Sequence, residues 1–98
     1  MNINQTRNGS ELTIGLSGRL DTVTSPELEN VLKNALEGVT TLIFDFSELS
    51  YISSAGLRVL LSAQKVMNRQ GKMKCVHVSE IVMEIFDVTG FSDILTIE

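Results

Sequence analysis

The chain is poor in the side chains from which catalytic and metal sites are usually built. Its 98 residues contain one cysteine, one histidine, one tyrosine and no tryptophan. A lone cysteine cannot form an intramolecular disulfide, and no second cysteine or histidine completes a metal site. A nucleophile, a base and a stabilising group would all have to come from this small set. The composition therefore predicts a protein that is not an enzyme and that has no catalytic residues, no metal ion and no cofactor.

Two of these scarce side chains fall in one alternating stretch. Cys75 and His77 are in phase with Met73, so we expect all three on one side of a strand over residues 72–78. A free cysteine in such a pattern is usually a small buried apolar residue. A strand histidine there is more often a hydrogen-bonded structural residue than a general base. Both are therefore predicted to serve the fold.

Basic side chains are outnumbered by acidic ones. The chain has 8 lysines and arginines against 12 aspartates and glutamates, which gives a formal net charge of −4. Proteins that bind the phosphate backbone normally carry a basic excess, so nucleic acid is not an expected partner. The N-terminus lacks the basic region and apolar run of a signal peptide, and no stretch approaches the length of a membrane span. We expect a cytoplasmic protein without direct membrane insertion.

Phosphate-binding loops are missing as well. No glycine-rich stretch of the P-loop or dinucleotide type follows a predicted strand. A two-component receiver would need an acidic cluster after its first strand and a phosphorylatable aspartate after a later one. Asp45 instead lies inside an apolar run, and no acidic pair occurs. The sequence thus offers no local motif for nucleotide binding and argues against a receiver domain.

The sequence does contain an alternation of strand-like and helix-like apolar periods, which is typical of an α/β domain. Strands are predicted over residues 2–6, 11–18, 41–46, 72–78 and 94–97, and helices from 24 or 25 to 38, from about 55 to 70 and from 79 to 90. We expect residues 1–98 to form a single domain of order β-β-α-β-α-β-α-β with a mixed, mostly parallel sheet. Strand 41–46 should be central and buried on both faces.

Individual residues support these boundaries. Asn8-Gly9 is favoured in the two-residue turn of a β-hairpin, which should join the first two strands. The first helix has two possible starts. Ser25 could cap it with Pro26 in the first helical position, or Thr24 could form a capping box with Glu27.

Ser53 and Ser54 lie at the predicted start of the second helix. A serine there commonly caps the helix and contributes about 1 kcal/mol. The same position is an anion site, because unpaired N–H groups and the positive end of the helix dipole would meet a phosphate. Gly56 adds no side chain to the first turn, so a partner could approach the serines. The residues alone leave a capping role and a regulatory role both open.

The second helix also carries a basic stripe. Arg58, Ser62, Lys65 and Arg69 recur at i, i+4, i+7 and i+11, which places them along one side of the helix. Such stripes are commonly solvated faces with cations near the helix C-terminus. A partner-facing role is the alternative.

A family resemblance spans nearly the whole chain and is carried by four stretches. They are Gly18-Arg19-Leu20-Asp21, the segment 42–52, Ser53-Ser54-Ala55-Gly56-Leu57, and the segment 81–91. In these stretches the chain resembles the bacterial anti-sigma factor antagonists, which are single-domain members of the STAS family.

The resemblance implies a function for one serine. In that family the unphosphorylated antagonist binds an anti-sigma factor and so frees a sigma factor; the anti-sigma factor is often a serine kinase that inactivates the antagonist, and a protein phosphatase restores it. The resemblance implies phosphorylation at Ser54, two residues before Gly56. Ser53 is the rival acceptor and stands where the family commonly has an aspartate. The implied partner-binding residues are Asp21, Thr22, Ser53, Ser54, Ala55, Gly56, Leu57 and Arg58.

Two other interpretations remain open at this point. The chain could be a non-switching STAS scaffold or a subunit of a signalling or lipid-transport complex, in which the serine only caps a helix. A nucleotide-binding STAS module is the third, although no motif in the sequence favours it.

Overall fold

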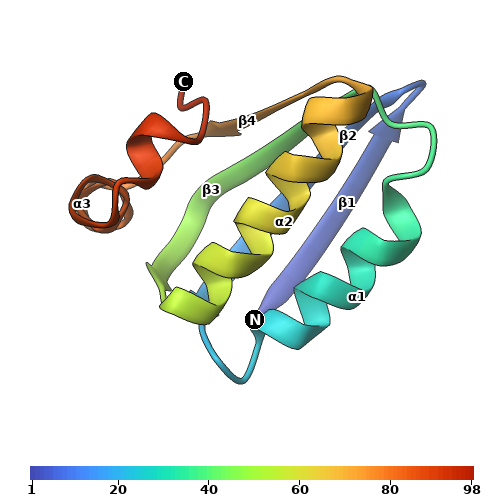
Figure 1. Ribbon diagram of the computed structural model, residues 1–98. Coiled ribbons are helices and arrows are strands. Elements are labelled where there is room, and N and C mark those ends of the chain that lie inside the picture. Colours follow the sequence, from blue (N-terminus) through green and yellow to red (C-terminus); the bar gives the residue numbers. More distant parts are fainter.

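A four-stranded mixed sheet forms the centre of the fold, and the computed structural model describes all residues from 1 to 98. The elements are β1 (Asn2–Asn8), β2 (Glu11–Leu20), α1 (Ser25–Ala35), β3 (Thr41–Ile52), α2 (Ser54–Gln70), β4 (Lys72–Val76), α3 (Glu80–Thr89) and the short 3-10 helix η1 (Phe91–Asp93), as Figure 1 shows. The strands lie in the order β1-β2-β3-β4. The first pair is antiparallel and the other two are parallel. The predicted α/β class, the hairpin and the mostly parallel sheet are confirmed.

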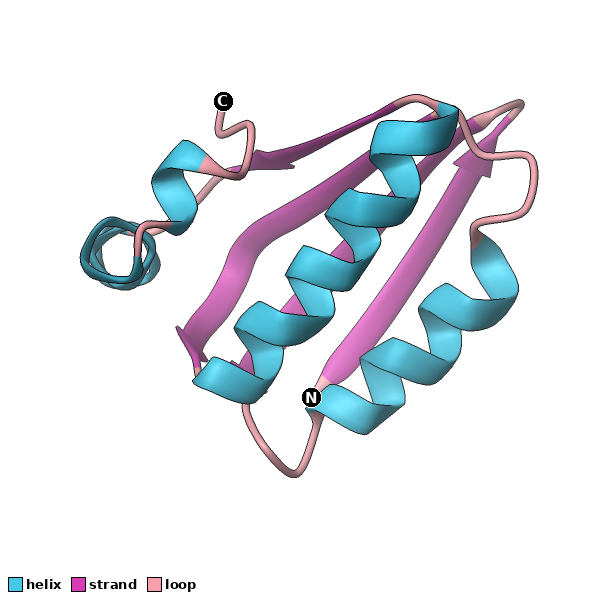
Figure 2. Cartoon of the chain, viewed as in Figure 1, coloured by secondary structure: helices cyan, strands magenta, loops and turns pink.

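The helices cover one face of this sheet. α1 and α2 lie side by side over it, and α3 packs against β3 on the side of α2 away from α1 (Figures 1 and 2). Burial in β3 therefore alternates: Leu42, Phe44 and Phe46 are buried, whereas Ile43 and Asp45 are half-buried. The interior position of β3 is confirmed. Its predicted burial on both faces is wrong, because no helix packs on the opposite side of the sheet.

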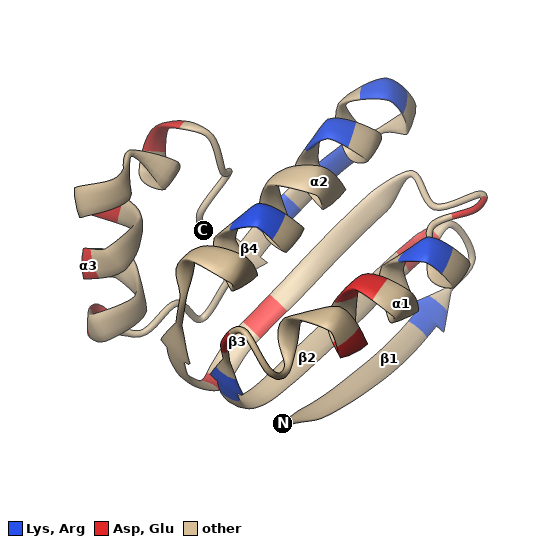
Figure 3. Ribbon diagram, turned by 60° about the horizontal axis from the view of Figure 1, so that its bottom comes forward, with Lys and Arg blue, Asp and Glu red and all other residues tan.

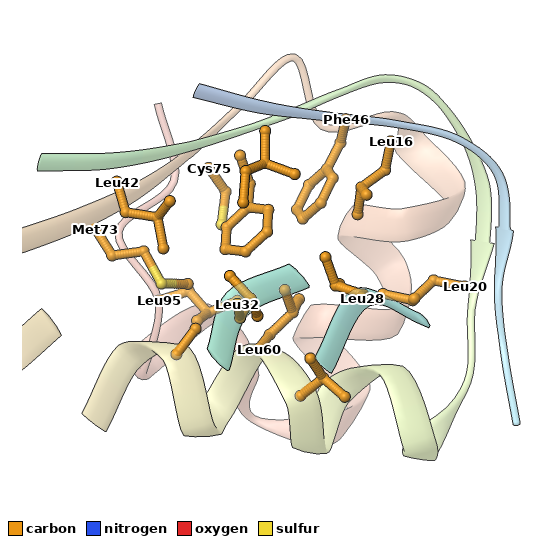
Figure 4. Close-up of a cluster of buried hydrophobic side chains, with 14 of the residues drawn as sticks. Leu16, Leu20, Leu28, Leu32, Leu42, Phe46, Leu60, Met73, Cys75 and Leu95 are labelled. Carbon is orange, nitrogen blue, oxygen red and sulfur yellow. The ribbon is translucent and has the colours of Figure 1, made fainter. Parts of the chain in front are cut away.

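The core lies between the sheet and the helices. Figure 4 shows Leu16, Phe46 and Cys75 from the strands pointing toward Leu28 and Leu60 from α1 and α2. α3 is attached to the same core through Phe86, whose ring centroid lies 6.2 Å from that of Phe46. The predicted burial of Cys75 is confirmed, and this burial raises the pKa of its thiol to about 12.

β3 is twice as long as the predicted strand, because it continues past Phe46 to Ile52. Its pairing with β2 shifts register between Gly15 and Ser17 and again between Gly18 and Arg19. Each shift inserts an extra residue into β3, as a β-bulge does. The bulges interrupt the alternation of apolar residues. Beyond the bulges, the two strands stay paired up to the start of α2.

His77 is not part of the strand that was predicted to contain it. β4 ends at Val76, and His77 is exposed with a positive φ of 57°. Its Nδ1 lies 3.1 Å from Oδ1 of Asp45 in the neighbouring strand β3. The prediction that His77 continues the apolar stripe of Met73 and Cys75 is therefore wrong. A left-handed backbone turn at His77 redirects the chain toward α3 instead.

The chain ends alongside β4. The predicted last strand is reduced to a single parallel bridge between Cys75 and Ile97. The backbone N–H of Cys75 donates to the carbonyl of Thr96 over 2.8 Å, and that of Glu98 donates to the carbonyl of Cys75 over 2.9 Å. This bridge completes the predicted order of elements and covers the edge of β4 at Cys75.

Candidate functional site

The candidate site lies where β2 and β3 end side by side. Leu20, the last residue of β2, pairs with Ile52, the last residue of β3. The backbone N–H of Ser53 then donates to the carbonyl of Leu20 over 2.8 Å. This bond fastens the start of α2 to the turn that follows β2. The structure thus brings together Asp21 and Ser54, which are 33 positions apart in the sequence.

Asp21 organises the turn between β2 and α1. Its Oδ1 accepts hydrogen bonds from the backbone N–H groups of Val23 and Thr24, at 3.0 and 3.1 Å, and from the Thr24 hydroxyl at 3.2 Å. The bond from the Thr24 N–H is the main reason that the pKa of the Asp21 carboxyl lies below its ordinary value. Asp21 is therefore an ionised group whose Oδ1 is engaged in holding the turn.

Thr24 stands at the N-cap of α1, but its hydroxyl does not cap the helix. The hydroxyl donates to the carbonyl of Arg19 over 2.7 Å and accepts from the backbone N–H of Asp21 over 2.9 Å. The capping box between Thr24 and Glu27 is not formed. Thr24 instead ties the turn back to the end of β2. Thr22 lies at the exposed outer side of this turn.

Ser53 occupies the N-cap position of α2 in extended backbone, with φ −97° and ψ 176°. Its side chain makes no capping bond, and its Oγ is buried without a hydrogen-bond partner. The first helical bond runs from the N–H of Leu57 to the carbonyl of Ser53 over 2.9 Å. No side chain therefore occupies the amide groups at the N-terminus of α2, and the first turn carries no acidic residue.

The other candidate residues of α2 divide by exposure. Ser54 and Arg58 are exposed and one helical turn apart, and Ala55 is half-buried. Gly56 and Leu57 are buried. A Cβ on Gly56 would lie 2.8 Å from side-chain atoms of both Leu20 and Ile52. Gly56 thus lets α2 pack closely on the ends of the two strands, which differs from the open approach that the sequence had indicated.

Three residues around this site were missed in the sequence. The guanidinium of Arg19 lies 4.4 Å above the ring centroid of Tyr51, and its Nε is 3.8 Å from Oδ2 of Asp21. Val23 in the same turn is 85% exposed. The pairing of Arg19 with Tyr51 follows from the bulges in β3 and has no local signal. An apolar residue in an otherwise polar turn could have identified Val23.

No group of three or more histidine, cysteine, aspartate or glutamate side chains is placed to hold a metal ion. None of the helices is both long and apolar enough to span a bilayer.

Comparison with known proteins identifies the family. The model of the STAS domain matches residues 2–98. The chain belongs to the STAS family. It is similar to the anti-sigma-B factor antagonist of Bacillus subtilis strain 168, with 29% identity over 98 residues that cover 99% of this chain and 90% of the relative. It is also similar to the protein of the same name from Listeria monocytogenes, with 32% identity over 95 residues, which are 94% of this chain and 82% of the relative.

Solved structures share this STAS fold. The anti-sigma factor antagonist SpoIIAA in its unphosphorylated form superposes with a TM-score of 0.78 at 20% identity, covering 99% of this chain and 87% of that one. The phosphorylated form of SpoIIAA, a Bacillus cell fate determinant, gives a TM-score of 0.77 at 20% identity, with coverage of 99% and 91%. At these identities the likeness concerns the fold.

Proposed function

We propose that this chain is an anti-sigma factor antagonist whose binding is switched off by phosphorylation at Ser54. The unphosphorylated form binds an anti-sigma factor that is also a serine kinase, and this binding frees a sigma factor. A protein phosphatase restores the active form. The similarity to antagonists over nearly the full length of the chain supports the class of function.

The difference in exposure between the two serines favours Ser54 over Ser53 as the phosphate acceptor. Ser54 is exposed in the first turn of α2, whereas Oγ of Ser53 is buried. A kinase must bring the attacking oxygen into line with the transferred phosphoryl group. Ser54 is exposed and can present its hydroxyl in this way, whereas the buried hydroxyl of Ser53 would first have to turn outward.

The exposed neighbours of Ser54 define the proposed contact surface. Thr22 and Arg58 lie on it, with the half-buried Asp21 and Ala55 at its edge. Gly56 and Leu57 are buried beneath it and position α2, and Ser53 acts through its backbone bond to Leu20. We therefore assign direct partner contacts to the exposed residues and a supporting role to the buried ones.

Phosphorylation acts as a local change of charge. It adds about −1.5 to −2 charges and three acceptor oxygens at the proposed contact surface. Within the antagonist, the free amide groups at the N-terminus of α2 and the guanidinium of Arg58 favour this anion. At a close interface the same group adds bulk and charge against the docked partner. The partner is therefore released while the fold of the antagonist is retained.

Phosphorylation and binding assays with the cognate anti-sigma factor kinase test this proposal. Ser54→Ala is expected to bind with wild-type affinity and to take up no phosphate. Ser54→Asp should keep the wild-type melting temperature and bind at least about tenfold more weakly, a loss of about 1.4 kcal/mol.

Ser53→Ala is the matched control and should be phosphorylated at the wild-type rate. Mass spectrometry of the treated wild type identifies the acceptor. Phosphate on Ser53 alone would refute the assignment of Ser54. Unchanged binding of Ser54→Asp, with no phosphate on the wild type, would identify a scaffold that does not switch.

A further inference from the structure

The outer side of α3 exposes large apolar side chains that nothing in the molecule covers. Val82 and Phe86 hold the inner side of the helix and are fully buried. On the outer side, Ile81 is 61% exposed and Val88 is 79% exposed. In an ordinary surface helix the apolar residues face the core and the exposed side is polar, so exposed apolar residues outside the core-facing stripe depart from that pattern. α3 is covered on one side only.

The exposed apolar residues form a line along the helix. Ile81 and Val88 are seven positions apart, so they lie on the same side two turns from one another. Ile85, which is half-buried, fills the position between them and connects this line to the core. Contiguous apolar surface of this kind marks interaction sites on soluble domains.

An acidic line runs beside the apolar one. Glu80, Glu84 and Asp87 recur at i, i+4 and i+7, and all three are exposed. They line a shallow hollow together with Ile81 and Met83. α3 itself contains no lysine or arginine, and its ribbon in Figure 3 carries acidic positions only. The outer face of α3 therefore pairs an apolar line with an acidic one.

No lysine or arginine lies on α3 or after it to offset the charge of the acidic line. The segment from residue 75 to residue 98 has five acidic residues, which are Glu80, Glu84, Asp87, Asp93 and Glu98, and of these Glu98 is paired with Lys74 of β4 over 3.7 Å. Most of the basic residues of the chain lie on α2 and β4 instead. A partner with positive charge is favoured at α3, since complementary potentials steer association and fix its register.

We propose that the outer face of α3 is a docking surface for a basic amphipathic helix of a partner protein. Apolar side chains of that helix cover Ile81 and Val88, in the helix-packing mode that uses i, i+3, i+4 and i+7 anchors. Its lysines and arginines lie against Glu80, Glu84 and Asp87.

A second copy of this chain is not the occupant. The basic stripe of α2 and the outer face of α3 are different surfaces, so their pairing would be head-to-tail and would not close into a dimer. The docking surface is also separate from the turn that holds Asp21, because α2 lies between α3 and α1 (Figure 1). It therefore provides for an interaction beyond the proposed one at Ser54.

A synthetic peptide helix tests this proposal. The probe carries leucines at i, i+3, i+4 and i+7 with lysines at the other positions, and a second peptide carries glutamates in place of the lysines. The lysine peptide is expected to bind saturably in fluorescence anisotropy, and the glutamate peptide is not. The double variant Ile81→Gln/Val88→Gln should weaken binding at least about tenfold. Glu84→Lys should weaken it as well and allow the glutamate peptide to bind.

Matched variants at other surfaces distinguish specific binding at α3 from nonspecific binding of the peptide. Val23→Gln changes an apolar residue that is 85% exposed, and Glu29→Lys reverses an exposed glutamate on α1. Both should bind the lysine peptide as the wild type does. The proposal is overturned if the peptide does not bind, if the α3 and control variants lose affinity equally, or if Ile81→Gln/Val88→Gln dissociates a dimer of the protein itself. Circular dichroism checks that each variant is folded.

Discussion

Replacing Ser53 by alanine should leave the domain as stable as the wild type or make it more stable. Oγ of Ser53 is buried and has no hydrogen-bond partner, although the residue stands at the N-cap of α2. Burying an unpaired hydroxyl is unfavourable by about 1–3 kcal/mol. Its removal deletes that penalty and breaks no bond in the structure. The small cavity left by the hydroxyl opposes this gain, so we expect the free energy of unfolding to stay the same or to rise by up to about 1 kcal/mol.

Ser79 provides the control, because it is also a serine at a helix N-cap in extended backbone. Oγ of Ser79 accepts a bond from the N–H of Val82 at 3.3 Å. Loss of a side-chain cap typically lowers stability by about 1 kcal/mol. Ser79→Ala should therefore be less stable than the wild type by about that amount, and less stable than Ser53→Ala by about 1–2 kcal/mol.

Urea unfolding followed by circular dichroism measures both differences. The dependence of the unfolding free energy on urea should be equal in the two variants, so that shifts of the midpoint report stability directly. In a domain of this size about 1 kcal/mol also moves the melting temperature by about 4–8 °C. If Ser53→Ala loses as much stability as Ser79→Ala, then the Ser53 hydroxyl does cap α2, and the argument for a buried, unreactive Ser53 fails with it.

Two other measurements address the titratable groups of the sheet. A hydrogen bond from the backbone N–H of Ser47 is the main cause that lowers the pKa of Asp45 below its ordinary value of 3.8, with His77 as a further cause. Because the pKa of Asp45 is lower in the folded state than in the unfolded state, its carboxylate stabilises the fold at pH values above the ordinary pKa. This contribution is lost as the pH falls through the folded-state pKa. Asp45→Asn should therefore be less stable than the wild type at pH 7, and the difference in unfolding free energy should shrink below about pH 4; a difference that does not change with pH would contradict this. Cys75 is fully buried and its pKa is raised to about 12, so a thiol reagent at pH 8 should label it in native protein far more slowly than in urea; equal rates would mean that the strand opens readily.

The sequence predicted those parts of the fold in which local pattern and tertiary environment agree. β2 and the first half of β3 alternate regularly, and α2 presents a broad apolar side, so all three elements could be recognised. The second half of β3 could not be recognised. Its buried residues Leu49 and Ile52 are three positions apart, because a bulge inserts an extra residue between them. A strict alternation of buried and exposed residues does not predict that inserted residue.

The error at His77 has a different origin. Met73, Cys75 and His77 alternate as a strand does, and only the backbone conformation separates the third from the others. A positive φ at a residue other than glycine is uncommon, and here it accompanies the contact with Asp45 on the neighbouring strand. That contact depends on how β3 and β4 are aligned. The local sequence therefore contains no signal for it.

At the candidate site, the sequence indicated the place but not the arrangement of its side chains. Asp21 and Ser54 were expected near one another, and the ends of the parallel strands β2 and β3 bring them together. Two hydroxyls at helix starts do not make the capping bonds that their positions suggest. Thr24 and Ser53 both stand at N-caps and neither caps. Which way such a hydroxyl turns depends on its rotamer and on the groups around it, and the pattern of residue types does not determine either.

The presence of Ser53 in place of an acidic residue affects how Ser54 can act as a switch. A carboxylate directly before Ser54 would repel a phosphate, because the two groups would be anions at close range. The helix N-terminus, in contrast, attracts an anion. In this chain the first turn of α2 contains no acidic residue, and the charge nearest along the helix is that of Arg58. Under the proposed function, the N-terminus of α2 and Arg58 favour a phosphate on Ser54 against the repulsion of the ionised Asp21 in the neighbouring turn, and the larger penalty arises when a partner is docked. The energetic effect of phosphorylation should then appear almost entirely in binding and hardly at all in stability, so a large fall in the melting temperature on phosphorylation would show that the switch works by disrupting the fold.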